Sequence, residues 1–142
     1  MNWQLIEDEL DEYVWDKATA QFWLDRRVPV SNDLLDWRIL SDMEKEVVKK
    51  AVGGLALLDT LQSEEGIYAL KKNARTLKER AVLSNFTFME SIHAKTYGTI
   101  LISLNTFKDI EEIYNWMNND RRMQFKARKI NEIYQNGTPM QV

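Results

Sequence analysis

The helical spacing of its apolar residues is the feature that most constrains the fold of this chain. Apolar side chains recur at intervals of three and four residues over nearly the whole sequence. No hairpin dipeptide separates two alternating apolar runs, and no stretch shows the strict two-residue alternation of a half-buried strand. We therefore predict an all-α protein.

A capping box marks the start of the first long helix. Ser41 is followed three residues later by Glu44, the spacing at which the two side chains satisfy the free amide groups of a helix N-terminus. The helix is predicted to run to Gly66, because glycine commonly ends a helix. Its inward face is predicted to carry Val48, Val52, Leu55 and Leu58.

A second capping box, Thr76 with Glu79, predicts another long helix that continues to about Ser103. Two further amphipathic stretches, 106–118 and 120–135, predict two more helices. The chain should therefore form a bundle in which short connections make neighbouring helices antiparallel.

The remaining segments are expected to be shorter or irregular. Residues 2–24 carry one short helix in this prediction, and residues 27–30 form an extended segment because proline disfavours helix at the residue before it. Ser31 then caps a short turn. At the other end, Gly137 is predicted to stop the last helix in the left-handed conformation, with Pro139 just beyond it.

Composition limits what a chain of this kind can do. Its 142 residues contain no cysteine, which excludes a thiol nucleophile, a disulfide framework and a zinc ribbon, and which is compatible with a cytoplasmic protein. The net charge of −3 argues against a nucleic-acid partner, since such proteins need a basic surface. The longest apolar run, 53–58, is too short to cross a membrane. We expect one soluble domain over residues 1–142.

The second long helix carries the chemistry. Glu90 and His93 are three residues apart, so that a carboxylate and an imidazole lie on adjacent turns and can reach one metal ion. Tyr97 follows one turn later on the same face. The surrounding positions are apolar, and a carboxylate buried there would be costly unless it were paired, protonated or bound to a cation.

The first long helix has a similar irregularity at Asp59, which interrupts the apolar run Leu57–Leu61 near the core face. A helical bundle with an inward Asp on one helix and Glu-x-x-His on the next matches the pattern of carboxylate-bridged dimetal sites. Oxygen and imidazole ligands suit iron or manganese. The two helices together predict a metal site.

Each of these residues also has an ordinary structural explanation. A lone Glu-x-x-His occurs by chance in many helices. Asp59 could be the buried partner of an arginine, and Tyr97 could be a core residue with a satisfied hydroxyl. Trp23, taken alone, reads as a core anchor. Only the combination favours a functional site.

Taken together, the segments resemble a known family: the radical-generating small subunit of class I ribonucleotide reductase, closest to the class Ib type. The resemblance covers nearly the whole chain in order and spacing. Its densest stretch lies around the Glu-x-x-His motif. The matching segments are Asn2-Trp3, Phe22–Leu24, Val28–Asp33, Gly53–Leu55, Leu57–Gln62, Asn85-Phe86, Phe88–Lys95, Tyr97 and Ile133–Gly137.

The resemblance implies a fold, a cofactor and a set of roles. It implies a ferritin-like bundle with a dinuclear manganese or iron centre, in which Asp59 and His93 ligate the first metal and Glu90 bridges the two. Tyr97 would be the site of the stored radical. Trp23 would relay an electron and a proton. The radical would pass to a large catalytic subunit that reduces ribonucleotides to deoxyribonucleotides, and class Ib members with dimanganese use a flavodoxin-like activator.

The chain departs from the family pattern because it contains a single histidine, His93. The family requires a second set of ligands, another Glu and a second Glu-x-x-His, and these are absent. We therefore expect the N-terminal half of a ferritin-like bundle, an incomplete domain whose exposed apolar faces need a cover. The expected cover is a C-terminal fragment of the small subunit or a second small-subunit copy. Alone, the chain should not hold a redox-competent dimetal centre.

Three interpretations stay open. The chain could be the N-terminal piece of a split small subunit that is active once a separate piece supplies the second ligand set. It could be a non-catalytic helical remnant that binds a reductase subunit without forming a radical. It could also be an incomplete reading frame. A Tyr97→Phe substitution separates the first two, because only the first loses activity.

Overall fold

The computed structural model describes residues 2–138 and 140 of the chain. All of the regular structure in these residues is helical, which confirms the prediction of an all-α protein. The elements in order are α1 (Glu9–Ala20), η1 (Asp25–Arg27), η2 (Val30–Asp33), α2 (Leu34–Ile39), α3 (Asp42–Leu61), the π-helix η3 (Gln62–Gly66), α4 (Ile67–Lys71), α5 (Leu77–Leu104), α6 (Phe107–Asn119) and α7 (Arg121–Asn136).

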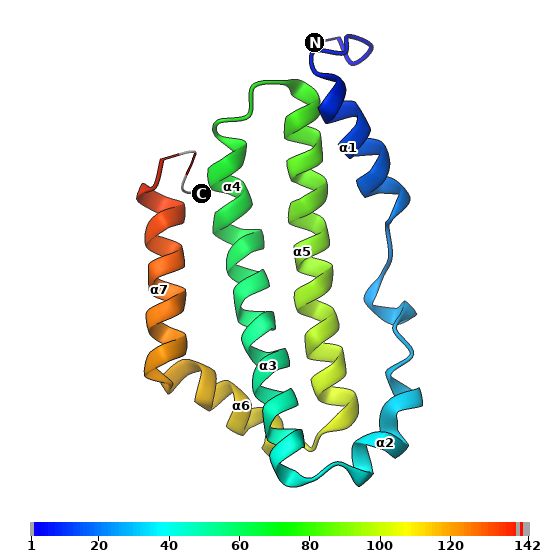
Figure 1. Cartoon of the computed structure of the whole chain (residues 1–142), viewed down its shortest axis with the longest axis vertical. Coiled ribbons are helices and arrows are strands. Elements are labelled where there is room, and N and C mark those ends of the chain that lie inside the picture. The colour runs from blue at the N-terminus through cyan, green and yellow to red at the C-terminus, as the bar shows by residue number, and fades with distance from the viewer. Residues whose placement is uncertain (1, 139, 141–142) are drawn as a thin grey trace.

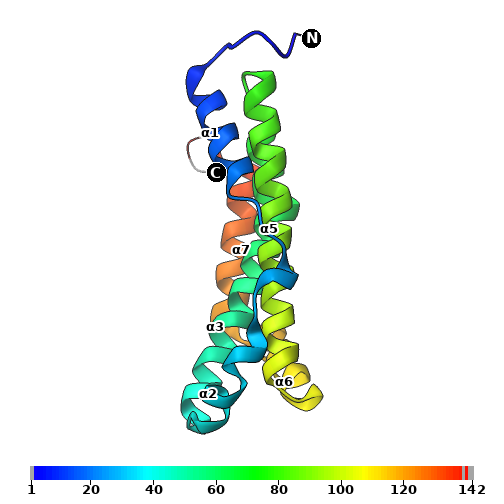
Figure 2. The same cartoon turned by 90° about the vertical axis from the view of Figure 1, so that its right-hand side faces the viewer.

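Two long antiparallel helical columns form the body of the molecule (Figure 1). One column is α3 with η3 and α4, and the other is α5, which packs beside it along most of its length. Helix α7 lies on the opposite side of the first column from α5, and α1 packs on the first part of α5 (Figure 1). The side view shows a long, narrow arrangement (Figure 2).

The best-buried apolar cluster lies where α3, α5 and α6 meet. Leu101, Ile113 and Met117 are each at most 4% exposed, and Val52 packs against them. Gly53 makes this junction possible, because a Cβ atom at that position would lie 2.7 Å from Cγ2 of Ile113. This junction therefore holds one end of the columns together.

The helix starts follow the predicted capping, with one difference. Ser41 and Glu44 form a complete capping box at α3. At α5 the Thr76 hydroxyl accepts from the Glu79 amide as predicted, but the Glu79 carboxylate accepts from the amide of Arg75 instead of from that of Thr76. The second box is therefore only half formed.

Gly66 does not stop the first long helix, contrary to prediction. Its backbone is right-handed helical (φ −65°, ψ −55°), and the helix continues through η3 and α4 to Lys71. The glycine is needed for space, since a Cβ atom there would lie 2.7 Å from Cζ of Tyr134 on α7. A close approach between two helices, and not a helix end, explains this residue.

Two other predictions are corrected. Val48 and Leu55 were expected to face inward with Val52 and Leu58, but their side chains are 36% and 43% exposed. Gly137 follows α7 in an extended conformation (φ −71°, ψ 157°) and not in the left-handed one. A Cβ atom at Gly137 would lie 2.4 Å from the Ile133 carbonyl oxygen, so this glycine is again explained by close packing. Pro139 lies outside the described residues.

Large apolar side chains remain exposed on several helices. Phe86 and Phe88 on α5 are 39% and 47% exposed, and Leu35 and Ile39 on α2 are exposed further still. Among the helices that the structure describes, none is long and apolar enough to span a membrane. The exposed apolar faces match the expectation that these helices need a cover.

Candidate metal centre

Asp59, Glu90 and His93 come together between the two columns. Asp59 lies in the last turn of α3, while Glu90 and His93 lie on successive turns in the middle of α5. Each side chain offers one ligand atom, and the three atoms all lie within 4.8 Å of one another. The antiparallel pairing of α3 with α5 produces this convergence, as the sequence predicted.

The ligand atoms already contact one another through the imidazole. Nδ1 of His93 lies 3.1 Å from Oε2 of Glu90 and 3.9 Å from Oδ2 of Asp59. The side chains are partly buried, between 20% and 34% exposed. Two carboxylate oxygens and one imidazole nitrogen are the donors that iron and manganese accept. The residues present therefore fit one side of a dimetal centre.

Electrostatics at this point favour a cation. Burial raises the pKa of Asp59, the negative charge of Glu90 raises it further, and His93 opposes the shift. A carboxylate whose ionisation is made costly by burial and by a neighbouring negative charge forms a site that a positive ion would stabilise.

Tyr97 lies one helical turn beyond His93 on α5. Burial raises the pKa of its phenol, and the charges of Asp59 and Glu90 raise it further. The phenol is therefore protonated at neutral pH, and both carboxylates are within electrostatic reach of it. Removing an electron from such a phenol would require its proton to leave as well.

Trp23 reaches the centre from the segment between α1 and η1. Its ring centroid lies 5.6 Å from that of His93, with the planes tilted by 30°. Asp25, two residues after Trp23, pairs with Lys95 of α5 at 3.2 Å and holds this segment against the helix. Trp23 therefore contacts the candidate ligand set directly, instead of serving as a remote core anchor.

A cavity of about 240 Å³ opens beside the ligand set and is lined in part by Trp23, Glu90 and His93. Asn85 also lines it, and the buried Oδ1 atom of Asn85 has no hydrogen-bond partner among the described residues. Such an orphan acceptor is uncommon in a completed core.

The sequence did not single out the neighbours on the other side of the centre. Tyr134 on α7, to which the sequence analysis gave no role of its own, lies near enough for the Glu90 charge to raise its pKa, after the larger effect of burial. Its hydroxyl donates to the side chain of Gln62 in the π-helix. A five-residue π-helix leaves no recognisable spacing of apolar residues, so the contact between Tyr134 and Gln62 could not be predicted from the sequence.

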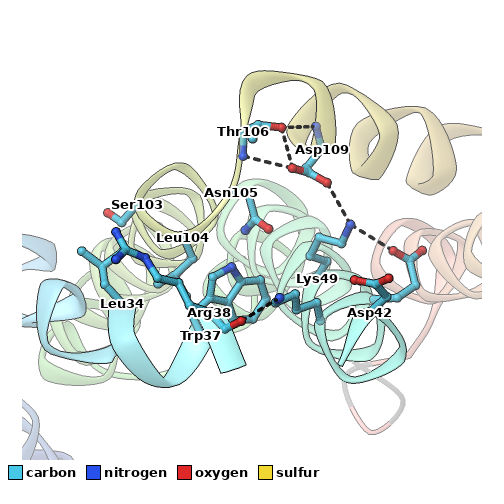
Figure 3. Close-up of a pocket in the computed structure, with 12 residues that line it drawn as sticks. Leu34, Trp37, Arg38, Asp42, Lys49, Ser103, Leu104, Asn105, Thr106 and Asp109 are labelled. Carbon is cyan, nitrogen blue, oxygen red and sulfur yellow. Dashed lines mark hydrogen bonds and ion pairs between the residues drawn. The ribbon is translucent and has the colours of Figure 1, made fainter. Parts of the chain in front are cut away.

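A larger cavity, about 690 Å³, lies at the end of the molecule where α2, α3, α5 and α6 meet (Figure 3). It contains none of the predicted site residues. Lys49 points between Asp109 and Glu46, at 3.2 Å and 3.1 Å. Thr106 and Asp109 form the capping box of α6 (Figure 3), one that the sequence analysis did not identify. Among the charged residues that line this cavity, Lys49 pairs with both Glu46 and Asp109.

Comparison with known proteins identifies relatives over the whole chain. Residues 1–141 match the sequence family described as ribonucleotide reductase, small chain. The β subunit of ribonucleoside-diphosphate reductase from Mycobacterium leprae is 40% identical over 140 residues, and the β subunit of ribonucleoside-diphosphate reductase 2 from Escherichia coli K12 is 39% identical over the same length. Both alignments cover 99% of this chain but only 43% and 44% of the relative.

Solved structures agree with the sequence relatives. The dimanganese(II) form of NrdF from Streptococcus sanguinis is 55% identical, with a TM-score of 0.96 over 99% of this chain and 50% of that one. A class I ribonucleotide reductase protein from Bacillus halodurans is 25% identical, with a TM-score of 0.83. The chain thus spans about half of the length of these proteins, or less.

Proposed function

The chain belongs to the ribonucleotide reductase small-chain family, and from this premise we propose that it forms the part of a radical-generating subunit that carries one half of a dimetal site. The proposal concerns reduction of ribonucleotides to deoxyribonucleotides by a complete reductase. The convergence of three ligand atoms within 4.8 Å on two antiparallel helices is the observation that carries it.

Asp59 and His93 are proposed to ligate one metal ion, and Glu90 to bridge that ion and a second one. Their oxygen and nitrogen donors suit manganese or iron, and the relative from S. sanguinis is a dimanganese(II) protein. When bound, such a metal pair would supply the one-electron oxidant. Nδ1 of His93 lies 3.1 Å from Oε2 of Glu90, so both donors face the same point, and a metal ion bound there would replace this contact.

Tyr97 is the proposed radical site. Its position one turn beyond His93 keeps the phenol beside the ligand set, and its raised pKa keeps it protonated until it is oxidised. Trp23 is the proposed electron and proton relay, and its ring contacts that of His93.

The second ligand set has to come from outside this chain, which contains one histidine. We propose a C-terminal small-subunit fragment, or a second small-subunit copy, as the source. The exposed Phe86 and Phe88 support a missing cover near the centre. A large catalytic subunit and a flavodoxin-like activator complete the proposed set of partners.

The test is co-production of the chain with a polypeptide that supplies the remaining part of the family fold. Metal content and the electron paramagnetic resonance spectrum are measured after exposure to oxygen with the activator present. We expect bound manganese or iron and a tyrosyl signal that Tyr97→Phe abolishes. Tyr114→Phe, which changes an exposed tyrosine on α6, is the matched control and should keep the signal.

A purified complex without metal and without a tyrosyl signal would contradict this proposal. It would favour the non-catalytic alternative, a helical remnant that binds a reductase subunit through its exposed apolar faces. The single histidine of the chain is the observation that supports that alternative. Loss of the signal in Asp59→Asn with retention of the complex would place the failure at the ligand set, and not at assembly.

A further inference from the structure

Helix α7 holds the π-helix through one tyrosine. The ring of Tyr134 packs so closely on Gly66 that a Cβ atom there would lie within 3.0 Å of three of its ring carbons. Its hydroxyl donates to Oε1 of Gln62 at the other end of the same π-helix. We call Tyr134, Gln62 and Gly66 the α7 clasp. The clasp contacts both ends of the five-residue segment and so restrains it as a unit.

A second hydrogen bond ties the π-helix to α5. Ser63, which is 6% exposed, lies 2.8 Å from Ser91 between their hydroxyl oxygens. Ser91 also donates to the carbonyl oxygen of Thr87, and a hydroxyl has one proton, so Ser63 is the donor of the shared bond. The π-helix is thereby fixed to the residue that follows Glu90 in sequence.

Both attachments lie at the level of the candidate ligands. Gln62 and Ser63 follow Asp59 by three and four residues, which is about one helical turn. The raised pKa of Tyr134 has the Glu90 charge as its second cause, so the phenol and that carboxylate are within electrostatic reach. π-Helical turns occur frequently at functional sites. These bonds therefore hold the backbone that follows Asp59 and the backbone that follows Glu90.

We infer that Tyr134 is a positioning residue for the candidate metal centre, acting through Gln62 and the π-helix to fix the distance between Asp59 on α3 and Glu90 on α5. This inference rests on the proposed function, because it assumes that the two carboxylates share a metal site. Tyr134 itself is not a proposed ligand. Outer groups that orient metal ligands commonly change metal affinity by about 10- to 100-fold.

The experiment measures the chain, co-produced with the polypeptide that supplies the remaining part of the family fold, in two ways. Hydrogen exchange of the amides of residues 62–66, without metal, reports whether the clasp holds the π-helix. Titration with Mn(II), followed by the electron paramagnetic resonance signal of the free ion, reports affinity at the three donors. The variants are Tyr134→Phe and Gln62→Met, which remove the same hydrogen bond from its two sides. Tyr114→Phe on α6 is the control.

Both clasp variants should speed exchange of residues 62–66 by about fivefold, the effect of one lost hydrogen bond. Both should weaken Mn(II) binding by about tenfold. The Tyr114→Phe control should leave exchange and affinity unchanged. Agreement between the two clasp variants would assign the effect to their shared hydrogen bond.

Three results would overturn the inference. Unchanged exchange in both variants would mean that the clasp does not hold the π-helix. Faster exchange with unchanged Mn(II) affinity would make the clasp purely structural. Absence of Mn(II) binding by the unsubstituted chain, with exchange still altered in the variants, would remove the proposed metal site from this chain and the positioning role with it. That last result is the only one of the three that also counts against the proposed function.

Discussion

The helix junction at one end of the columns and the candidate centre in their middle are covered by the chain to different degrees. At the α3–α5–α6 junction, apolar residues such as Leu101 and Ile113 are almost fully buried, and Lys49 pairs with Asp109 and Glu46. Around the candidate centre, the charged groups are only partly buried, and the buried Oδ1 of Asn85 has no partner in the described chain. The first region is closed by apolar side chains of the chain itself, while the second leaves the candidate ligands partly exposed.

The junction is expected to determine the stability of the chain, while the candidate centre carries the residues with a proposed chemical function. The junction buries apolar side chains, and this burial contributes strongly to the free energy of unfolding. The centre instead collects two carboxylates whose mutual repulsion works against the metal-free fold. Substitutions in the two regions should therefore have different sizes and, in one case, opposite signs.

The largest effect is expected from opening the closed junction. Leu101→Ala removes a side chain that is 2% exposed and should lower the free energy of unfolding by about 3 kcal/mol, through lost burial and a residual cavity. Ile102→Ala, at the next position of α5, changes a side chain that is 68% exposed and should cost less than about 0.5 kcal/mol. Urea denaturation of both variants measures the difference. Equal losses would show that the junction is not the stabilising core.

A pair of glycine substitutions tests the packing beside the centre. Gly66→Ala places a methyl group against the Tyr134 ring and should destabilise the chain by about 1–3 kcal/mol. Gly98→Ala, on α5, meets no atom within 4 Å and should stabilise it by about 0.5–1 kcal/mol, because alanine favours helix over glycine. Thermal unfolding followed by circular dichroism compares them. A neutral Gly66→Ala would contradict the close approach of α7.

The smallest effect concerns pH and has the opposite sign. The folded-state pKa of Asp59 lies above its ordinary value, so ionisation costs more in the folded chain, and stability is lost as the pH rises from the unfolded-state pKa through the folded-state one. Asp59→Asn should thus stabilise the metal-free chain at neutral pH, by less than about 1 kcal/mol because solvent screens this partly exposed group. The gain should vanish in acid below the unfolded-state pKa.

The measurement for Asp59 is the free energy of unfolding as a function of pH. Asp36→Asn on α2, at an exposed position, is the matched control for the loss of one carboxylate. A destabilising Asp59→Asn at neutral pH would indicate that the carboxylate is already paired favourably in the metal-free chain. It would weaken the view that this region is prepared for a cation.

The sequence was sufficient for the parts of the molecule that depend on local chemistry. Ser41 with Glu44 located the start of α3, and helical spacing placed Glu90, His93 and Tyr97 on α5. Asp59 was found because a charge in an apolar run needs a partner. These signals are short-range, or follow from the antiparallel packing of neighbouring helices.

The errors have a common physical origin in contacts between distant segments. Gly66 was assigned to a helix end, but it is explained by the space required where Tyr134 of α7 packs against it. The bond from Tyr134 to Gln62 joins residues 72 positions apart and leaves no trace in local spacing. Val48 and Leu55 were expected to face inward because of their helical periodicity. Periodicity does not show which apolar positions the rest of this chain covers, and both side chains are exposed.

The π-helix also sets the angular phase of the long first column. Each residue of a regular α-helix advances about 100° around the axis, and a π turn accommodates about one residue more than an α turn. The side chains of α4 are therefore rotated by roughly that angle from where an uninterrupted α3 would place them. Ile67, which is 2% exposed, owes its inward direction to this rotation. A single-residue deletion within 62–66 that restored a regular α turn would leave the side chains of α4 facing as they do now, whereas winding all five residues as a regular α-helix would turn Ile67 away from the core while Asp59 kept its place.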